Sequence, residues 1–299
     1  MPAPPVHRAL AIAAAFVSAL LIAPAPPAAA RSGLLLEPAP DPEAMDATTY
    51  DESGRAVGRS SFEMSTDETG VLTMTVVLAV DGGGRNVSRA RLAPVEPVDE
   101  DGAPRLRLLE QRSRATRADG EALDLLVVDH ERRRVSCYPP TPSLTAPGDV
   151  APAEGARLPF DVDADLRLLG HERGRQLELP EDDHVVNVPI QLLFRPILEG
   201  RQDQLRFQLA ACKGEPVLHA MIAVRAPAAD DGNALVEVRY GPDLGEAVAW
   251  LAARLLPKLS FWFDARDGRY VGHRMPLHRK GPDILLLRSD VAPGRLGLR

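Results

Sequence analysis

Histidines next to aspartates are the residues of this sequence whose types come closest to acid–base chemistry. Asp129 precedes His130, and Asp182 and Asp183 precede His184. A hydrolase using His130 or His184 would need that imidazole to meet a carboxylate and a nucleophile. Neighbouring residues of a strand point to opposite faces, so adjacency alone does not bring the carboxylate to the ring. The sequence also has no Gly-x-Ser-x-Gly nucleophile motif, and it predicts no catalytic residue.

Two other pairs of residues have types that bind metals or form covalent links. His273 and His278 are five residues apart, which suits neither one face of a strand nor one face of a helix, so a shared metal is not expected. Cys137 and Cys212 are the two cysteines of the chain. In an oxidising compartment such a pair predicts one disulfide, with two buried free thiols as the alternative. The sequence predicts neither a metal site nor a cofactor.

The first thirty residues have the pattern of a signal peptide. A short region with Arg8 precedes a largely apolar stretch at 9–23, and the small residues at 28–30 fit a cleavage site. The apolar stretch is shorter than the roughly 20 residues that span a bilayer, although an uncleaved anchor is the alternative. No cysteine follows to carry a lipid. We therefore expect a periplasmic or secreted protein with no transmembrane span after cleavage of residues 1–30.

The residues after the signal peptide predict a single, mainly β domain at 47–290. Short runs rich in β-branched residues alternate with turns such as Glu52-Ser53-Gly54 and Asp119-Gly120. Strands at such regular spacing favour an antiparallel meander, which forms a curved sheet or an open barrel.

Three stretches are expected to lie outside the regular strands. A Pro- and acid-rich stretch at 31–46 predicts a flexible leader, and residues 291–299 predict a tail. A Pro- and Ala-rich stretch at 139–159 predicts a surface loop within the domain, with a linker between two halves as the alternative.

Two helical segments are expected to pack against the sheet. A helix at about 244–256 would be capped by Asp243 and stopped by Pro257, with leucines and a valine along one face. A shorter helical turn at about 188–195 would be capped by Asn187 and begun by Pro189.

The chain from 259 to 290 predicts three consecutive strands, and it contains the candidate ligand-binding residues. Alternation of side chains puts Phe261 and Phe263 on one face and Trp262 on the other. His273 shares its phase with apolar neighbours, so it is expected either to face a concave cavity or to be a buried structural histidine. The candidates for lining a ligand cavity are Phe261, Phe263, Val271, His273 and Met275.

A resemblance to a known family rests on several short motifs. They are a turn with Gly54, Val57 and Gly58, the segment LLFRPILEG at 192–200, the strand with Trp262, and the Asp264-x-x-Asp267-Gly268 turn. This layout resembles a family of periplasmic all-β domains of unknown function (DUF3108-like), which is similar in shape to outer-membrane lipoprotein carriers. The resemblance implies a barrel-like fold and a role in the cell envelope, and it transfers no catalytic residue.

Two functions follow from these expectations. The first is a non-catalytic envelope module that binds or scaffolds an apolar ligand, a lipid or an envelope protein. The second is an exported hydrolase that uses His130 or His184. The net charge of −7 argues against nucleic acid as a partner, because its phosphates repel an acidic protein.

Overall fold

The structure is a computed structural model of the 299-residue chain. It describes residues 35–38, 44–82, 84–95, 104–121, 123–139, 174–181, 184–227, 234–244, 259–278 and 281–296. The expected signal peptide at 1–30, nearly all of the 139–159 loop and almost the whole of the 244–256 helix lie outside these residues.

Strands make up most of the described chain. In the N-terminal half they are β1 (Leu35–Leu36), β2 (Ala44–Tyr50), β3 (Ala56–Thr66), β4 (Leu72–Ala79), β5 (Arg85–Val95), β6 (Arg105–Thr116), β7 (Leu125–Asp129) and β8 (Arg134–Tyr138). In the C-terminal half they are β9 (Arg175–Glu178), β10 (Gln204–Cys212), β11 (Pro216–Arg225), β12 (Leu235–Pro242), β13 (Leu259–Asp264), β14 (Tyr270–Pro276) and β15 (Asp283–Arg288). The short helices are α3 (Ile190–Leu193), α4 (Arg195–Leu198) and the 3-10 helix η2 (Pro293–Leu296). Among the described residues no helix is long and apolar enough to cross a bilayer.

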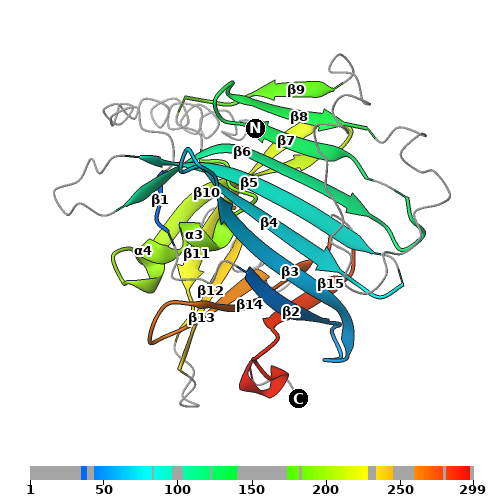
Figure 1. Cartoon of the computed structure of the whole chain (residues 1–299), viewed down its shortest axis with the longest axis vertical. Helices are drawn as coiled ribbons and strands as arrows, with labels where there is room; N and C mark the ends of the chain where they lie inside the picture. The colour runs from blue at the N-terminus through cyan, green and yellow to red at the C-terminus, as the bar shows by residue number, and fades with distance from the viewer. Residues whose placement is uncertain are drawn as a thin grey trace, which may run out of the picture. The chain divides into compact units, whose positions relative to one another are not determined.

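The described strands form one 15-stranded antiparallel sheet, in the order β10-β11-β12-β13-β14-β15-β2-β3-β4-β5-β6-β7-β8-β9, with β1 paired to β6. Strands that pair in the sheet are consecutive in sequence except for β1 with β6 and for β15 with β2, a pair that joins the last strand to the first long one (Figure 1). The first and last strands of this order, β10 and β9, do not pair with each other, so the curved sheet is not closed. The predicted mainly β meander is confirmed.

Short turns with a carboxylate at their first position set the register of the N-terminal hairpins. Asp51 Oδ1 accepts hydrogen bonds from the backbone N–H groups of Ser53, at 2.9 Å, and Arg55, at 3.1 Å. Gly54 has φ of +79°, a conformation that glycine adopts without a steric penalty. The turn between β3 and β4 repeats this arrangement around Asp67 and Gly70.

Part of the expected leader at 31–46 belongs to the sheet instead. Leu36 pairs with β6 and is almost fully buried, and residues 44–46 begin β2. Glu37, between these strands, forms ion pairs with Arg105 of β6 and with Arg201, which follows α4. Leu36 buries apolar surface, and this outweighs the Pro- and acid-rich composition around it.

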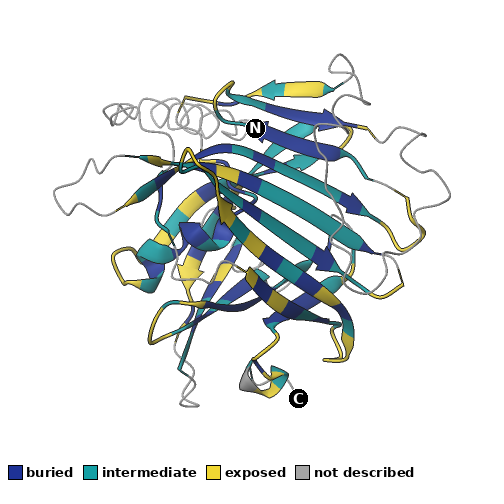
Figure 2. Ribbon diagram, viewed as in Figure 1, coloured by how far each residue is buried: buried dark blue, intermediate teal, exposed yellow. Residues whose placement is uncertain are grey.

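The segment 184–198, which we call the interior segment, lies on the concave side of the sheet and contains α3 and α4. Figure 2 shows α3 as largely buried. Phe194 is fully buried, and its ring lies 5.4 Å from that of Phe261 and 6.2 Å from that of Phe207 (centroid to centroid). The other buried apolar residues of the segment are Val185, Val186, Val188, Ile190, Leu192, Leu193 and Ile197.

The predicted helical turn at 188–195 is confirmed, but its cap is not the expected one. The residue before α3 is Pro189, which makes no side-chain cap hydrogen bond. The Asn187 side chain instead donates to the Ala210 carbonyl oxygen at 2.7 Å and accepts from the Ala210 N–H at 2.9 Å. Asn187 therefore fixes the segment to β10 and does not cap a helix.

The two ends of the open sheet meet through side chains and one disulfide. Cys137 of β8 is bonded to Cys212 of β10, with 5.7 Å between their Cα atoms. Around this bond lies a second apolar core, which we call the seam: Leu126, Val128, Val135, Cys137, Leu179, Val185 and Ala210. Arg175 of β9 also forms a 2.8 Å ion pair with Glu215. The predicted disulfide is confirmed, and its position shows that it links sheet ends that no hydrogen-bond ladder joins.

Breaking the disulfide should destabilise the protein, because the bond closes a loop between residues 75 positions apart. We expect the double substitution Cys137→Ala, Cys212→Ala to lower the free energy of unfolding by about 2–4.5 kcal/mol. Equilibrium denaturation in guanidinium chloride measures this loss. A thiol reductant should shift the wild-type midpoint and leave that of the double variant unchanged. A wild-type midpoint insensitive to complete reduction would contradict the role of the seam disulfide.

Candidate functional site

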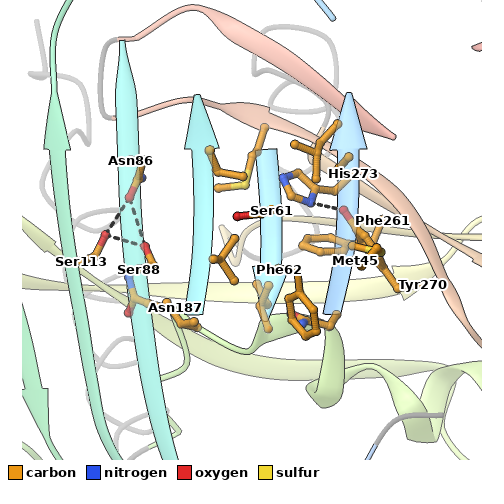
Figure 3. Close-up of a pocket in the computed structure, with 18 of the residues that line it drawn as sticks. Met45, Ser61, Phe62, Asn86, Ser88, Ser113, Asn187, Phe261, Tyr270 and His273 are labelled. Carbon is orange, nitrogen blue, oxygen red and sulfur yellow. Dashed lines mark hydrogen bonds between the residues drawn. The ribbon is translucent and has the colours of Figure 1, made fainter. Parts of the chain in front are cut away.

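A cavity of about 180 Å³ lies between the concave face of the sheet and the interior segment (Figure 3). Side chains from β2 to β6, from β10 and from β12 to β15 contribute to its wall. The apolar lining residues are Met45, Ala47, Phe62, Val76, Leu78, Val188, Ile190, Leu209, Phe261, Met275 and Leu286. The polar ones are Ser61, Asn86, Ser88, Ser113, Asn187, Gln191, Tyr240, Tyr270 and His273. The lining residues that the structure describes include no Asp, Glu, Lys or Arg.

One polar group of the wall comes from neighbouring strands β5 and β6. The Ser88 and Ser113 hydroxyls lie 2.9 Å apart, and both donate to Asn86 Oδ1, at 3.1 and 3.2 Å. Asn86 Nδ2 donates to the Leu277 carbonyl oxygen at 3.0 Å. Figure 3 shows this cluster on one side of the cavity, with His273 and Tyr270 on the other.

The second polar group is a tyrosine and a histidine from β14. The Tyr270 hydroxyl and His273 Nδ1 lie 2.6 Å apart. The His273 ring also packs on Phe261, with 5.0 Å between ring centroids. His273 is 6% exposed, and its Nε2 has no hydrogen-bond partner among the described residues. Burial lowers the pKa of His273 from 6.5 to about 3, so the ring is neutral at neutral pH.

A β-bulge decides which residues of β14 reach the cavity. Trp262 pairs with Gly272, whereas the next residue, Phe263, pairs with Tyr270, so Val271 is the extra residue. The bulge brings Tyr270 onto the same face as His273, three positions away, because an extra residue reverses the alternation of side chains. The prediction that Val271 shares the phase of His273 assumed an unbroken strand.

The structure therefore divides the predicted cavity residues. Phe261, His273 and Met275 line the cavity. Val271 is buried but is not among the lining residues, and Phe263 lines a different pocket beside α4. That Phe261 and Phe263 share a face is confirmed, since both are buried whereas Trp262 is only half-buried.

One buried amide holds the interior segment against the sheet. Gln111 of β6 is 1% exposed, and both the oxygen and the nitrogen of its side-chain amide form hydrogen bonds. Its Oε1 accepts from the N–H groups of Asn187, at 2.6 Å, and Val188, at 2.8 Å. Its Nε2 donates to the Val185 carbonyl oxygen at 2.8 Å and lies 2.8 Å from His130 Nε2. Gln111 thus fixes the wall of the cavity that carries Val188 and Ile190.

The histidines considered for a hydrolase lie apart from the cavity. His130 Nε2 is in hydrogen-bond contact with the Gln111 amide, so His130 accepts from an N–H group at that nitrogen. Asp129 Oδ1 accepts from the Arg132 N–H at 2.8 Å. His184 is exposed, and the aspartates at 182 and 183 lie outside the described residues. His278 follows β14 and is not among the lining residues.

Sequence reasoning missed the N-terminal half of the cavity, although β5 carries a recognisable signal. Asn86 and Ser88 share the alternation phase of Ala90 and Leu92, two fully buried residues. Polar residues that continue an apolar face indicate a hydrated or functional interior.

Comparisons with known proteins add little to this description. The chain matches no model of a known protein family and no curated protein. Among solved structures, a β-barrel-like protein of domain of unknown function DUF1849 from Brucella abortus is 12% identical, with a TM-score of 0.37 over 83% of this chain and 98% of that one. A putative thioesterase II from Thermobifida fusca YX is 12% identical, with a TM-score of 0.15 over 85% of this chain and 82% of that one. At such low TM-scores neither likeness supports an argument about function, and the DUF3108-like resemblance remains a prediction.

Removing the Gln111 amide should destabilise the protein. Gln111→Leu leaves two N–H groups and one carbonyl oxygen of the interior segment without their partner, and we expect a loss of about 3 kcal/mol or more in the free energy of unfolding. The matched control is Gln204→Leu on β10, an exposed position where the change should be within about 0.5 kcal/mol. Urea denaturation compares the two variants, and equal midpoints would contradict the role of Gln111.

The stability of the protein should fall in mild acid because of His273. Its pKa is about 3 in the folded state and near 6.5 in the unfolded chain, so between these values the unfolded state binds more protons. This difference lowers the free energy of unfolding by about 2 kcal/mol between pH 6.5 and pH 4.5. His273→Asn, whose amide can still reach Tyr270, should remove that part of the slope. His184→Asn controls for the loss of an exposed ring, and identical slopes in wild type and His273→Asn would refute the assignment.

Proposed function

We propose that the protein is an exported, non-catalytic binding module of the cell envelope that holds an apolar ligand inside its curved sheet. The observation that carries the proposal is the cavity of about 180 Å³, whose wall is mainly aliphatic and aromatic. Well-formed apolar cavities with a few convergent polar groups are the usual form of a small-molecule site. The candidates Phe261, His273 and Met275 line this cavity, and this supports the proposal.

Export is supported by the sequence at 1–30 and by the disulfide between Cys137 and Cys212. Disulfides persist in oxidising compartments and are rare in the cytosol. A place in the periplasm also agrees with the DUF3108-like resemblance, under which the ligand would be a lipid or another apolar component of the envelope.

A substitution that fills the cavity tests this function. Ala47 of β2 is buried and lines the cavity, whereas Ala44 of the same strand is exposed. We expect Ala47→Leu to weaken binding of toluene, an apolar probe of suitable size, by about tenfold or more, because the added side chain occupies the volume of the probe. Ala44→Leu adds the same side chain on the solvent side and should leave binding unchanged.

Toluene binding is measured by calorimetric titration, and native mass spectrometry of protein taken from its own periplasm identifies the natural occupant. An apolar molecule retained by wild type and by Ala44→Leu, but lost from Ala47→Leu, is the expected result. Equal toluene affinity in both variants, or no binding to wild type, would refute the proposed site.

A further inference from the structure

The His273 ring, which lines the cavity, carries a buried polar atom that the described residues leave without a hydrogen bond. Nδ1 is occupied by the Tyr270 hydroxyl at 2.6 Å, whereas Nε2 is buried without a partner among the described residues. A buried nitrogen without a hydrogen bond costs about 1–3 kcal/mol. In Figure 3 the ring nitrogen that is not bonded to Tyr270 lies on the opposite side of the ring. A ligand group that reaches Nε2 would remove this cost.

Several of the other polar groups around the cavity have partners within the protein. Asn86, Ser88 and Ser113 are bonded to one another, and Asn86 also holds the Leu277 carbonyl. Asn187 exchanges two hydrogen bonds with the backbone of Ala210. A ligand could bond His273 Nε2, a buried atom with no partner among the described residues, without breaking an existing hydrogen bond.

The wall favours an uncharged ligand. None of the described lining residues is an acid, a lysine or an arginine, and burial keeps His273 neutral above a pKa of about 3. Burial also raises the pKa of Tyr240, so this phenol stays neutral too. An ionised group in this cavity would lose its hydration and find no opposite charge, which is strongly unfavourable.

The volume limits the size of what can be enclosed. An apolar cavity of about 150 Å³ holds a benzene molecule, so about 180 Å³ suits roughly six to ten non-hydrogen atoms. A larger ligand would place only one end here.

We infer that the cavity selects an uncharged, mostly apolar molecule with one hydroxyl group, and that His273 Nε2 forms a hydrogen bond with this hydroxyl. This inference rests on the proposed function, because it specifies the ligand class of the same cavity. A hydroxyl both donates and accepts, so it satisfies Nε2 in either tautomer of the neutral ring. A hydrocarbon of equal size would leave Nε2 unpaired.

Phenol and toluene provide the test, because they have the same number of non-hydrogen atoms and differ by a hydroxyl in place of a methyl group. Phenol gives up hydrogen bonds to water when it enters an apolar cavity, so without a partner it should bind more weakly than toluene. With His273 as its partner, we expect phenol to bind wild-type protein at least as tightly as toluene at pH 7. Benzoate, the charged probe, should bind at least tenfold more weakly than phenol.

Two substitutions at His273 separate its two nitrogens. The amide of His273→Asn reaches the place of Nδ1, and so keeps a partner for Tyr270, but nothing replaces Nε2. We expect it to weaken phenol binding by about tenfold and toluene binding by a smaller factor, because toluene forms no hydrogen bond with Nε2. The longer side chain of His273→Gln reaches the place of Nε2 and should recover most of the phenol affinity.

Binding is measured by calorimetric titration of the full-length, disulfide-bonded protein. In protein labelled with ¹⁵N-histidine, phenol should also shift the Nε2 resonance of His273, and toluene should shift it much less. This second readout does not depend on any variant folding.

The outcomes distinguish this inference from the proposed function. If toluene binds but phenol binds more weakly, or if phenol binding survives His273→Asn with no shift of the ring resonance, the role of His273 is refuted while the apolar site stands. If benzoate binds as tightly as phenol, the restriction to uncharged ligands is refuted. If neither toluene nor phenol binds wild-type protein, both the inference and the proposed function fail.

Discussion

The hydrogen bonds of the Gln111 amide are the interaction on which the interior of this protein depends. A curved sheet of this size has a concave face that must be covered, and here the chain itself covers it with the interior segment at 184–198. Such a segment brings backbone N–H and carbonyl groups into an apolar space, where each needs a partner. Gln111 supplies partners for three of them, and the backbone of Gln208 in β10 supplies partners for the Val186 N–H and the His184 carbonyl oxygen. These bonds hold the residues just before α3, and the apolar side chains of α3 and α4 pack in the core of the sheet.

The position of the interior segment, which the Gln111 hydrogen bonds fix, determines where the cavity lies. The interior segment enters beside β10 and places Phe194 among aromatic rings from β10, β12 and β13. That cluster fills one part of the concave space, while the part between β2–β6 and β14 is left with short side chains such as Ala47, Ser88 and Ser113. Gln111 therefore determines both where the concave space is filled and where the cavity remains, because a shift of the interior segment along β6 would redistribute the volume.

The sequence predicted the local features of this fold well and its long-range features poorly. Turns such as that at Asp51–Gly54 depend on residues within five positions of each other, and alternation correctly placed Phe261 and Phe263 on the inner face. The bulge at Val271 has no distinctive residue to announce it, because it is set by the pairing of β13 with β14. The contact of Gln111 with a segment more than seventy residues away leaves no local pattern either, and Leu36 enters the sheet from an otherwise Pro-rich stretch. Half of the cavity wall was missed for the same reason, since it depends on which strands face one another.

Because the sheet ends at the seam, the number and length of its end strands are less constrained than in a closed barrel. In a closed barrel the number of strands and their stagger together fix the radius, so a strand cannot be added or lost without a new register throughout. Here β9 and β10 end the sheet, and the approach of the two ends rests on packed side chains and the bond between Cys137 and Cys212. Strands at either end can therefore lengthen or multiply by overlapping further, while the registers of the others stay unchanged. The width of the curved sheet can therefore change in evolution through the extent to which its two ends overlap.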